Sequence, residues 1–186
     1  MLREAVDDPA EAVCSALADG RLSAADLTAR RLGEFLGKTT SVLYHRWGSL
    51  DAFLLAVAGA ATRRLAVHLL GGGSLPDLSA RFVAFGLDHP DLYALMFERR
   101  YDWDGLRSLG VFEEPTPGLT LWEHVVDRVE EFGSDDPAMD ARLLYAGLHG
   151  LVSLASTGRA NVGDLTVSDR DLAIQAARRL AEKMVP

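Results

Sequence analysis

The segment from Thr28 to Leu54 constrains the fold more than any other part of the chain. Apolar residues recur at helical spacing up to Leu36, and Gly37 then offers a helix stop, because glycine tolerates the left-handed conformation. Thr28 and Thr39 are both suited to cap a helix N-terminus. The segment therefore predicts a helix, a tight connection and a second short helix, which is the layout that places a recognition helix in a DNA major groove.

The rest of the chain is also expected to be helical. Ser49 can cap a long third helix that closes at the glycine run 71–73, and residues 98–118, rich in Arg, Asp, Gly and Pro, predict a long loop with partial order. No alternating strand pattern appears, so the predicted fold class is all-α. Further helices are predicted at residues 9–18, 78–87, 92–97, 119–132 and 138–156, and after a cap at Ser168.

The segment resembles the DNA-binding head of TetR-type transcriptional repressors. Capping, turn and core positions of that family pattern all match in register, with Trp47 standing for the usual Phe. Gly33 stands where alanine is usual, Lys38 where valine is usual, and Leu50 where the family has a phosphate-contacting lysine. The other matching residues are Leu27, Thr28, Leu32, Leu36, Gly37, Thr39, Leu43, Tyr44, Ser49 and Leu54.

This resemblance implies a three-helix helix-turn-helix head in residues 1–50 and a helical ligand-binding and dimerisation body in residues 51–186, joined by the long helix. Thr40, Ser41 and Val42 are expected at base edges, with Arg30 reaching a guanine. Lys38 is expected to compensate partly for Leu50 at the DNA backbone. The remaining residues expected at the DNA are Thr28, Arg31, Thr39, Tyr44, His45 and Arg46.

The C-terminal half resembles a TetR subgroup marked by a tryptophan and a histidine-glycine pair, carried here by the run 145–154 with Gly158 and Arg159, and with Tyr145 for the tryptophan. Aromatic residues with a few polar tips suit a pocket for an apolar small molecule, or else a packed core. His149 is either a ligand contact or a core histidine bonded to a carbonyl. The expected ligand-binding residues are Phe82, Phe85, His89, Tyr93, Phe97, Trp103, Trp122, Tyr145 and His149.

Charge is unevenly distributed along the chain. The whole chain carries −8, whereas residues 28–50 hold four basic side chains and one acidic one, for a net +3, which leaves −11 elsewhere. A small basic island on an acidic body is typical of a dedicated DNA-reading face, although four basic residues on two helices are also an ordinary solvated surface. The acidic first helix, with Glu4, Asp7, Asp8 and Glu11, argues against DNA binding.

Catalytic and metal-binding chemistry is not evident. The chain has no G-x-S-x-G elbow, no Walker loop and no H-E-x-x-H motif, and the pairs His124 with Asp127 and His89 with Asp91 lack further ligands. No enzyme, cofactor or metal is therefore expected. The single cysteine, Cys14, excludes an internal disulfide and suits a cytoplasmic protein. No apolar run approaches the roughly 20 residues of a membrane span, so no membrane partner is expected.

Two function hypotheses follow. The first is a ligand-responsive repressor that binds a pseudo-palindromic DNA operator as a homodimer, with the last two helices, including the stripe around Ala177, at the dimer seam. The alternative is a TetR-like small-molecule-binding protein with weakened or lost DNA binding, motivated by Leu50 and the acidic first helix. An enzyme on a helical scaffold has no positive support.

Overall fold

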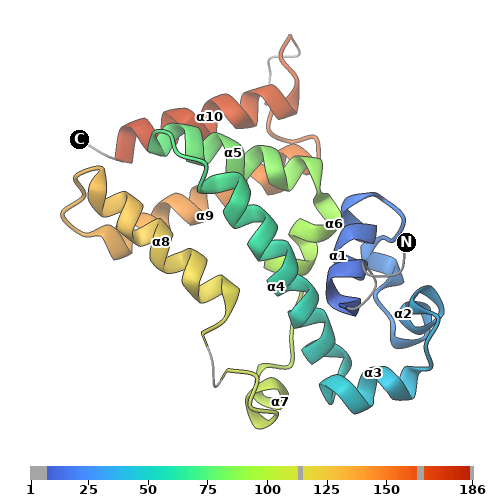
Figure 1. Cartoon of the computed structure of the whole chain (residues 1–186). Helices are drawn as coiled ribbons and strands as arrows, with labels where there is room; N and C mark the ends of the chain where they lie inside the picture. Colours follow the sequence, from blue (N-terminus) through green and yellow to red (C-terminus); the bar gives the residue numbers. More distant parts are fainter. Residues whose placement is uncertain (1–7, 113–114, 163–165, 185–186) are drawn as a thin grey trace, which may run out of the picture. The chain divides into compact units, whose positions relative to one another are not determined.

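A computed structural model describes residues 8–112, 115–162 and 166–184 of the chain. Every regular element in these ranges is a helix, which confirms the predicted all-α class (Figure 1). The elements are α1 (Pro9–Ala18), a 3₁₀ turn (Ala24–Asp26), α2 (Ala29–Leu36), α3 (Thr40–Trp47), α4 (Leu50–Leu69), α5 (Leu75–Asp88), α6 (Pro90–Tyr93), a π-helical turn (Ala94–Glu98), α7 (Trp103–Ser108), α8 (Pro117–Glu131), α9 (Pro137–Ser156) and α10 (Asp169–Met184).

The described residues group into two compact units by their packing. The head unit contains the residues up to Arg63 together with those of Asp91–Gly118, and the body unit contains Arg64–Pro90 and the residues from Leu119 onward. The chain thus leaves the body after α5, contributes α6, the π-helical turn and α7 to the head unit, and returns to the body at α8. The functional boundary predicted at residue 50 remains a prediction.

With one exception, the residues predicted to cap or stop the helices of the head do so. The Thr28 hydroxyl accepts a hydrogen bond from the Arg31 backbone at 3.3 Å, and Gly37 closes α2 at a φ of 62°. The Ser49 hydroxyl accepts from the Ala52 backbone at 3.0 Å at the start of α4. Thr39 occupies the capping position of α3, but its hydroxyl makes no capping bond to the backbone and instead lies 2.9 Å from that of Ser41.

The predicted loop over residues 98–118 is partly helical. Its residues include α7, which begins where the Asp102 carboxylate accepts a hydrogen bond from the Gly105 backbone at 3.0 Å. Leu106 is buried and ties this short helix to the head. The prediction missed α7 because a helix of six residues is too short for the apolar spacing to repeat.

The body is organised around α5 and α10, which are its most extensively packed pair. Asp77 near the start of α5 pairs with Arg178 near the end of α10, and Asp88 pairs with Arg170 at the other ends at 2.8 Å. The two helices are therefore antiparallel. Hydrogen bonds from Ser74 and then from Arg178 hold the pKa of Asp77 at about 2, so this carboxylate is ionised at neutral pH.

The alanine stripe of α10 lies inside the body unit. Ala173, Ala177 and Ala181 are fully buried, because small residues let α10 approach α5 closely. The expectation that the stripe around Ala177 forms a dimer seam is therefore wrong. Sequence spacing identified the buried face of α10 but could not identify the helix that covers it.

The long helix α4 corrects the expectation that no apolar part of the chain approaches the length of a membrane span. By length and composition alone it is long and apolar enough to cross a membrane, and it is the one such helix among the described residues. In the folded chain 56% of its apolar window is buried. The central helix of a water-soluble helical protein passes the same test, so the apolar composition of α4 is accounted for by its burial.

The acidic residues of the first helix have structural partners where they are described. The Asp8 carboxylate caps α1 by accepting from the Ala10 backbone at 2.9 Å, and Glu11 pairs with Arg63 of α4 at 2.8 Å. Glu4 and Asp7 lie outside the described residues. A helix cap and an ion pair within the head therefore account for two of the four acids.

The close approach of α2 and the turn before α3 yields a stability prediction. The Lys38 backbone N–H donates to the Gly33 carbonyl at 2.9 Å, and a Cβ at Gly33 would lie 2.8 Å from the Lys38 carbonyl oxygen. Overpacking costs about 1–3 kcal/mol, which exceeds the roughly 1 kcal/mol that alanine gains over glycine in a helix. We expect Gly33→Ala to lower the free energy of unfolding, measured by urea denaturation.

Gly59→Ala in α4 is the matched control for this substitution. A Cβ at Gly59 would lie at an ordinary 3.4 Å from the Pro117 ring, so we expect this variant to be unchanged or more stable. Equal stabilisation by both substitutions would contradict the close approach at Gly33.

Candidate DNA-binding face and effector-binding body

The outer face of α3 is exposed and its inner face is buried. Leu43 is 2% exposed, whereas its neighbours Val42 and Tyr44 are 43% and 47% exposed. A helix that packs on the protein through one face leaves the opposite face available to a partner. The exposed face of α3 carries hydroxyls, an imidazole and a guanidinium, which are groups that can contact bases and phosphates. The other exposed residues of this face are Thr39, Thr40, Ser41, His45 and Arg46.

An aromatic contact fixes the C-terminal end of α3. The Trp47 ring meets the buried Phe53 ring of α4 edge-on, with centroids 4.6 Å apart. The Arg46 guanidinium lies over the Trp47 ring at 4.5 Å. Trp47, which replaces the phenylalanine usual at this position, therefore both anchors α3 and orients a cation on its surface.

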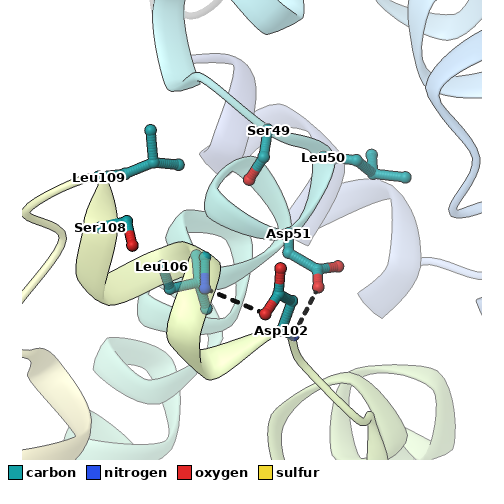
Figure 2. Close-up of a pocket in the computed structure, with 8 residues that line it drawn as sticks. Ser49, Leu50, Asp51, Asp102, Leu106, Ser108 and Leu109 are labelled. Atoms are coloured by element: carbon teal, nitrogen blue, oxygen red, sulfur yellow. Dashed lines mark hydrogen bonds between the residues drawn. The ribbon is translucent and has the colours of Figure 1, made fainter.

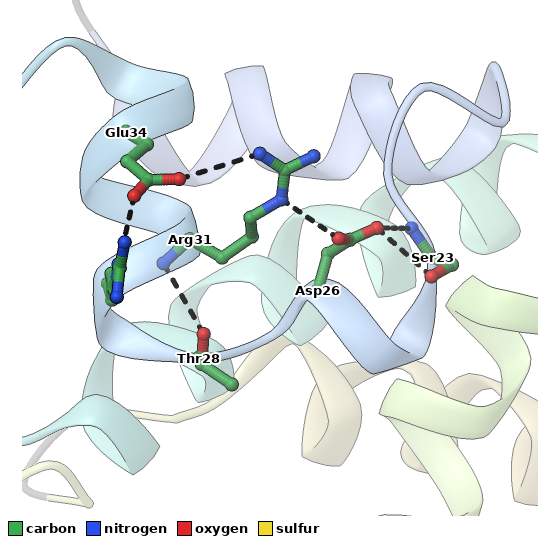
Figure 3. A network of polar contacts seen from close by, with 6 residues as sticks. Ser23, Asp26, Thr28, Arg31 and Glu34 are labelled. Atoms are coloured by element: carbon green, nitrogen blue, oxygen red, sulfur yellow. Dashed lines mark hydrogen bonds and ion pairs between the residues drawn. The ribbon is translucent and has the colours of Figure 1, made fainter.

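A network of polar contacts runs along α2 and the 3₁₀ turn before it (Figure 3). Arg31 lies 3.1 Å from Asp26 and 3.5 Å from Glu34, and Glu34 also pairs with Arg30 at 3.0 Å. Asp26 in turn accepts hydrogen bonds from the backbone and hydroxyl of Ser23 at 2.9 and 3.0 Å. The network therefore orients both arginines expected at the DNA.

The same network reduces the positive charge of the face. Hydrogen bonds from Ser23 and Arg31 lower the pKa of Asp26, and the bond from Arg30 lowers the pKa of Glu34. Both acids are ionised at neutral pH and offset the two arginines. Exposed pairs of this kind contribute little to stability because solvent screens them, so a DNA phosphate or base edge can displace Glu34 from Arg30.

A hollow of about 410 Å³ lies between the start of α4 and α7 (Figure 2). Leu50 lines it, at the position where the TetR heads that this segment resembles carry a lysine. Its apolar side chain faces the same hollow as Leu106 and Leu109 from α7 and its C-terminal end, which accounts for a leucine at this site. The remaining lining residues are Ser49, Asp51, Asp102, Gly105 and Ser108.

Asp51 fastens the start of α4 to the segment that precedes α7. Its carboxylate accepts from the Arg99 guanidinium and from the Asp102 backbone N–H, each at 2.8 Å (Figure 2 shows the second bond). Burial raises the pKa of Asp51, but the hydrogen bonds from Arg99 and Asp102 outweigh it and hold the pKa below its usual value. No sequence pattern predicted this contact, because Arg99 and Asp102 lie 48 and 51 residues after Asp51 in the chain.

Six of the nine expected ligand-binding residues belong to the body. Tyr145 is central: its ring lies 6.3 Å from Phe82, 6.4 Å from Trp122 and 6.1 Å from His149, between ring centroids. Partial burial raises the pKa of Tyr145, so its phenol stays protonated and can donate a hydrogen bond. This group joins α5, α8 and α9 and has the aromatic walls and polar tips of a site for an apolar molecule.

A second aromatic group of the body lies around Phe85 of α5. Its ring centroid lies 5.0 Å from His89 and 6.2 Å from His68. Phe85 is buried, and the Nδ1 atom of His89 is buried with no hydrogen-bond partner among the residues that the structure describes. His68 was not predicted as part of this group, because the residues at helical spacing from it in α4 form no aromatic pattern.

The other three expected ligand-binding residues belong to the head unit. The Tyr93 and Phe97 rings lie 4.9 Å apart, and the Trp103 ring lies 5.2 Å from Tyr101 and 6.1 Å from Phe112. These residues therefore form separate aromatic contacts within the head. Their role in ligand binding stays a prediction.

Comparison with known proteins identifies the family. The family model "Tetracyclin repressor-like, C-terminal domain" matches residues 75–180, which is more than half of the chain. The chain belongs to the TetR family. TetR proteins are transcriptional regulators that in general bind DNA, form dimers and are not enzymes.

One solved structure is similar over nearly the whole chain. It is a protein from Rhodococcus sp. assigned to the TetR family of transcriptional regulators, with 19% sequence identity, a TM-score of 0.58, and coverage of 97% of this chain and 98% of that chain. At this identity the likeness concerns the TetR fold alone. The comparison with curated proteins gives no match.

The Asp51 contact yields a prediction about the stability of this TetR head. Asp51→Asn removes a charged acceptor from two hydrogen bonds, so we expect a loss of about 1–3 kcal/mol in the free energy of unfolding at pH 7. The folded-state pKa of Asp51 is lowered, so its contribution is present above its unfolded pKa and is lost as the pH falls through the folded value. The difference in free energy of unfolding between Asp51→Asn and the parent protein should therefore be smaller at pH 3 or below than at pH 7. Urea denaturation at the two pH values measures this difference.

Asp104→Asn is the control, because Asp104 is exposed and its one ion pair within the described part of the chain is with Arg107 on the surface of α7. This variant should change the free energy of unfolding by less than about 1 kcal/mol. A loss for Asp51→Asn no greater than for Asp104→Asn would contradict the fastening role.

Proposed function

We propose that the chain is a cytoplasmic, ligand-responsive transcriptional repressor that binds a pseudo-palindromic DNA operator as a homodimer. The observation that carries this proposal is α3: its inner face is anchored by Leu43 and Trp47, and its outer face is exposed and polar. Two such helices in a dimer match two half-sites one DNA turn apart, about 34–36 Å. A ligand that favours another spacing of the two helices releases the DNA.

The proposed effector is an apolar small molecule bound in the body. The Tyr145 group offers aromatic contacts from Phe82 and Trp122 and a polar tip from His149. The continuous helix α4 begins in the head unit and ends in the body unit, so it is the natural route by which binding in the body reaches α3.

A second candidate function is small-molecule binding without DNA binding. Two observations favour it: Leu50 replaces a cation at the start of α4, and both arginines of α2 are paired with acids. Titration of DNA that includes the promoter region of the protein's own gene, across a range of salt concentrations, separates the two candidates. Salt-dependent binding supports the repressor, and no binding to any DNA supports the second candidate.

A prediction about base reading follows from the exposed position of Arg30. If its guanidinium exchanges Glu34 for a guanine edge, Arg30→Ala should cost about 1–3 kcal/mol on the operator and less on random DNA. Tyr44→Phe, which removes only a hydroxyl expected at a phosphate, should weaken binding to both DNAs similarly. Fluorescence anisotropy at one fixed salt concentration measures both variants. Equal losses on operator and random DNA for Arg30→Ala would exclude base reading by this residue.

A prediction about the dimer follows from the exposed face of α9. Leu143 is 54% exposed, and Met139 and Leu154 are exposed on the same helix, so we propose this apolar stripe as the dimer seam. Leu143→Glu should give a folded monomer in sedimentation experiments. Ala177→Glu instead buries a charge within the body and should destabilise it by about 3 kcal/mol or more. A Leu143→Glu variant that sediments as a dimer would move the seam elsewhere.

A further inference from the structure

The segment around α7 reaches the recognition helix of the head. The Leu109 side chain lies against Gly48, the residue that ends α3, where a Cβ would come within 2.9 Å of Leu109 Cδ2. Leu106, Ser108 and Leu109 also share the hollow at the start of α4 (Figure 2). Figure 1 accordingly draws α3 and α7 at the same, N-terminal end of α4.

This position is next to the path of a DNA backbone. A recognition helix occupies a major groove about 12 Å wide, and phosphates line both edges of that groove. Groups that flank the recognition helix therefore meet phosphate oxygens, which fix the register of the protein on the duplex. Because Leu109 touches the residue that ends α3, the neighbouring residues of α7 flank the recognition helix.

Arg107 is the cation at this position. It lies between two residues that line the hollow, Leu106 and Ser108, and its side chain is 66% exposed. Among the described residues, its guanidinium pairs with Asp104 alone, at 2.8 Å, three residues earlier on the surface of the same helix. Such an exposed pair contributes little to stability, so a phosphate can displace the carboxylate.

We propose that Arg107 binds a DNA phosphate beside the recognition helix. Leu50 leaves the start of α4 without a cation because its side chain lines the apolar hollow, and the adjacent helix α7 supplies the cation in its place. Asp104 opposes the contact in the free protein. The site rests on the proposed function, because it requires that α3 enters a major groove.

The test uses the full-length chain and measures affinity for DNA that includes its own promoter region, at several salt concentrations. Arg107→Gln should flatten the plot of log affinity against log salt by about 0.9 for each head bound. Asp104→Asn should strengthen binding, because it releases Arg107 and removes a negative charge near the backbone. Both residues are exposed, so neither substitution alters the core.

Arg179 and Glu182 of α10 provide a matched control pair. They are also spaced by three residues, and Arg179 is 68% exposed in an ion pair of 3.1 Å. Arg179→Gln and Glu182→Gln change the net charge by the same amounts as Arg107→Gln and Asp104→Asn, respectively, but in the body unit. They should leave the salt dependence unchanged.

The outcomes separate this inference from the proposed function. If the parent protein binds DNA and Arg107→Gln behaves like Arg179→Gln, the phosphate contact is overturned and the repressor function stands. If Asp104→Asn and Glu182→Gln strengthen binding equally, a general charge effect replaces the contact. If the parent protein binds no DNA at any salt concentration, the proposed function and the contact both fail.

Discussion

The anchoring of α3 by its buried side is the constraint on which the rest of the head depends. Leu43 enters the core and Trp47 packs edge-on against Phe53, so the helix cannot rotate about its axis without exposing apolar surface. The exposed residues therefore face outward as a fixed set. The Lys38 carbonyl approaches Gly33 closely at the connection between α2 and this helix, and a residue without a Cβ permits that approach.

Charge within the head is balanced by local pairs. Arg30, Arg31 and Arg107 each contact an acid on their own helix or in the adjacent turn. These pairs leave the fold nearly indifferent to whether the arginines are held by carboxylates or by phosphates, because exposed ion pairs contribute little. In the proposed DNA complex, a duplex would meet cations that are already positioned and whose carboxylate partners are exchanged for phosphates at low cost.

The sequence predicted local structure well and tertiary partners poorly. Thr28, Gly37 and Ser49 act within four residues of themselves, so their caps and stops could be predicted before any packing was known. The contact of Asp51 with Arg99, and the burial of Ala177 against α5, depend on segments far apart in the chain, which a spacing pattern cannot pair. The short helix α7 is an intermediate case: it is a local element, but its role follows from its tertiary position in the head and not from its own sequence.

The excursion of residues 91–118 into the head unit has a consequence for how this architecture can be recombined. The two units are joined by the chain at three places, after Arg63, after Pro90 and after Gly118, rather than by a single linker. A head cut out as one continuous N-terminal piece would lack α7 and would lack Arg99 and Asp102, the partners of Asp51, and it would expose Leu50. Exchange of such heads between regulators, by evolution or by engineering, is therefore restricted to pairs whose bodies carry a matching excursion.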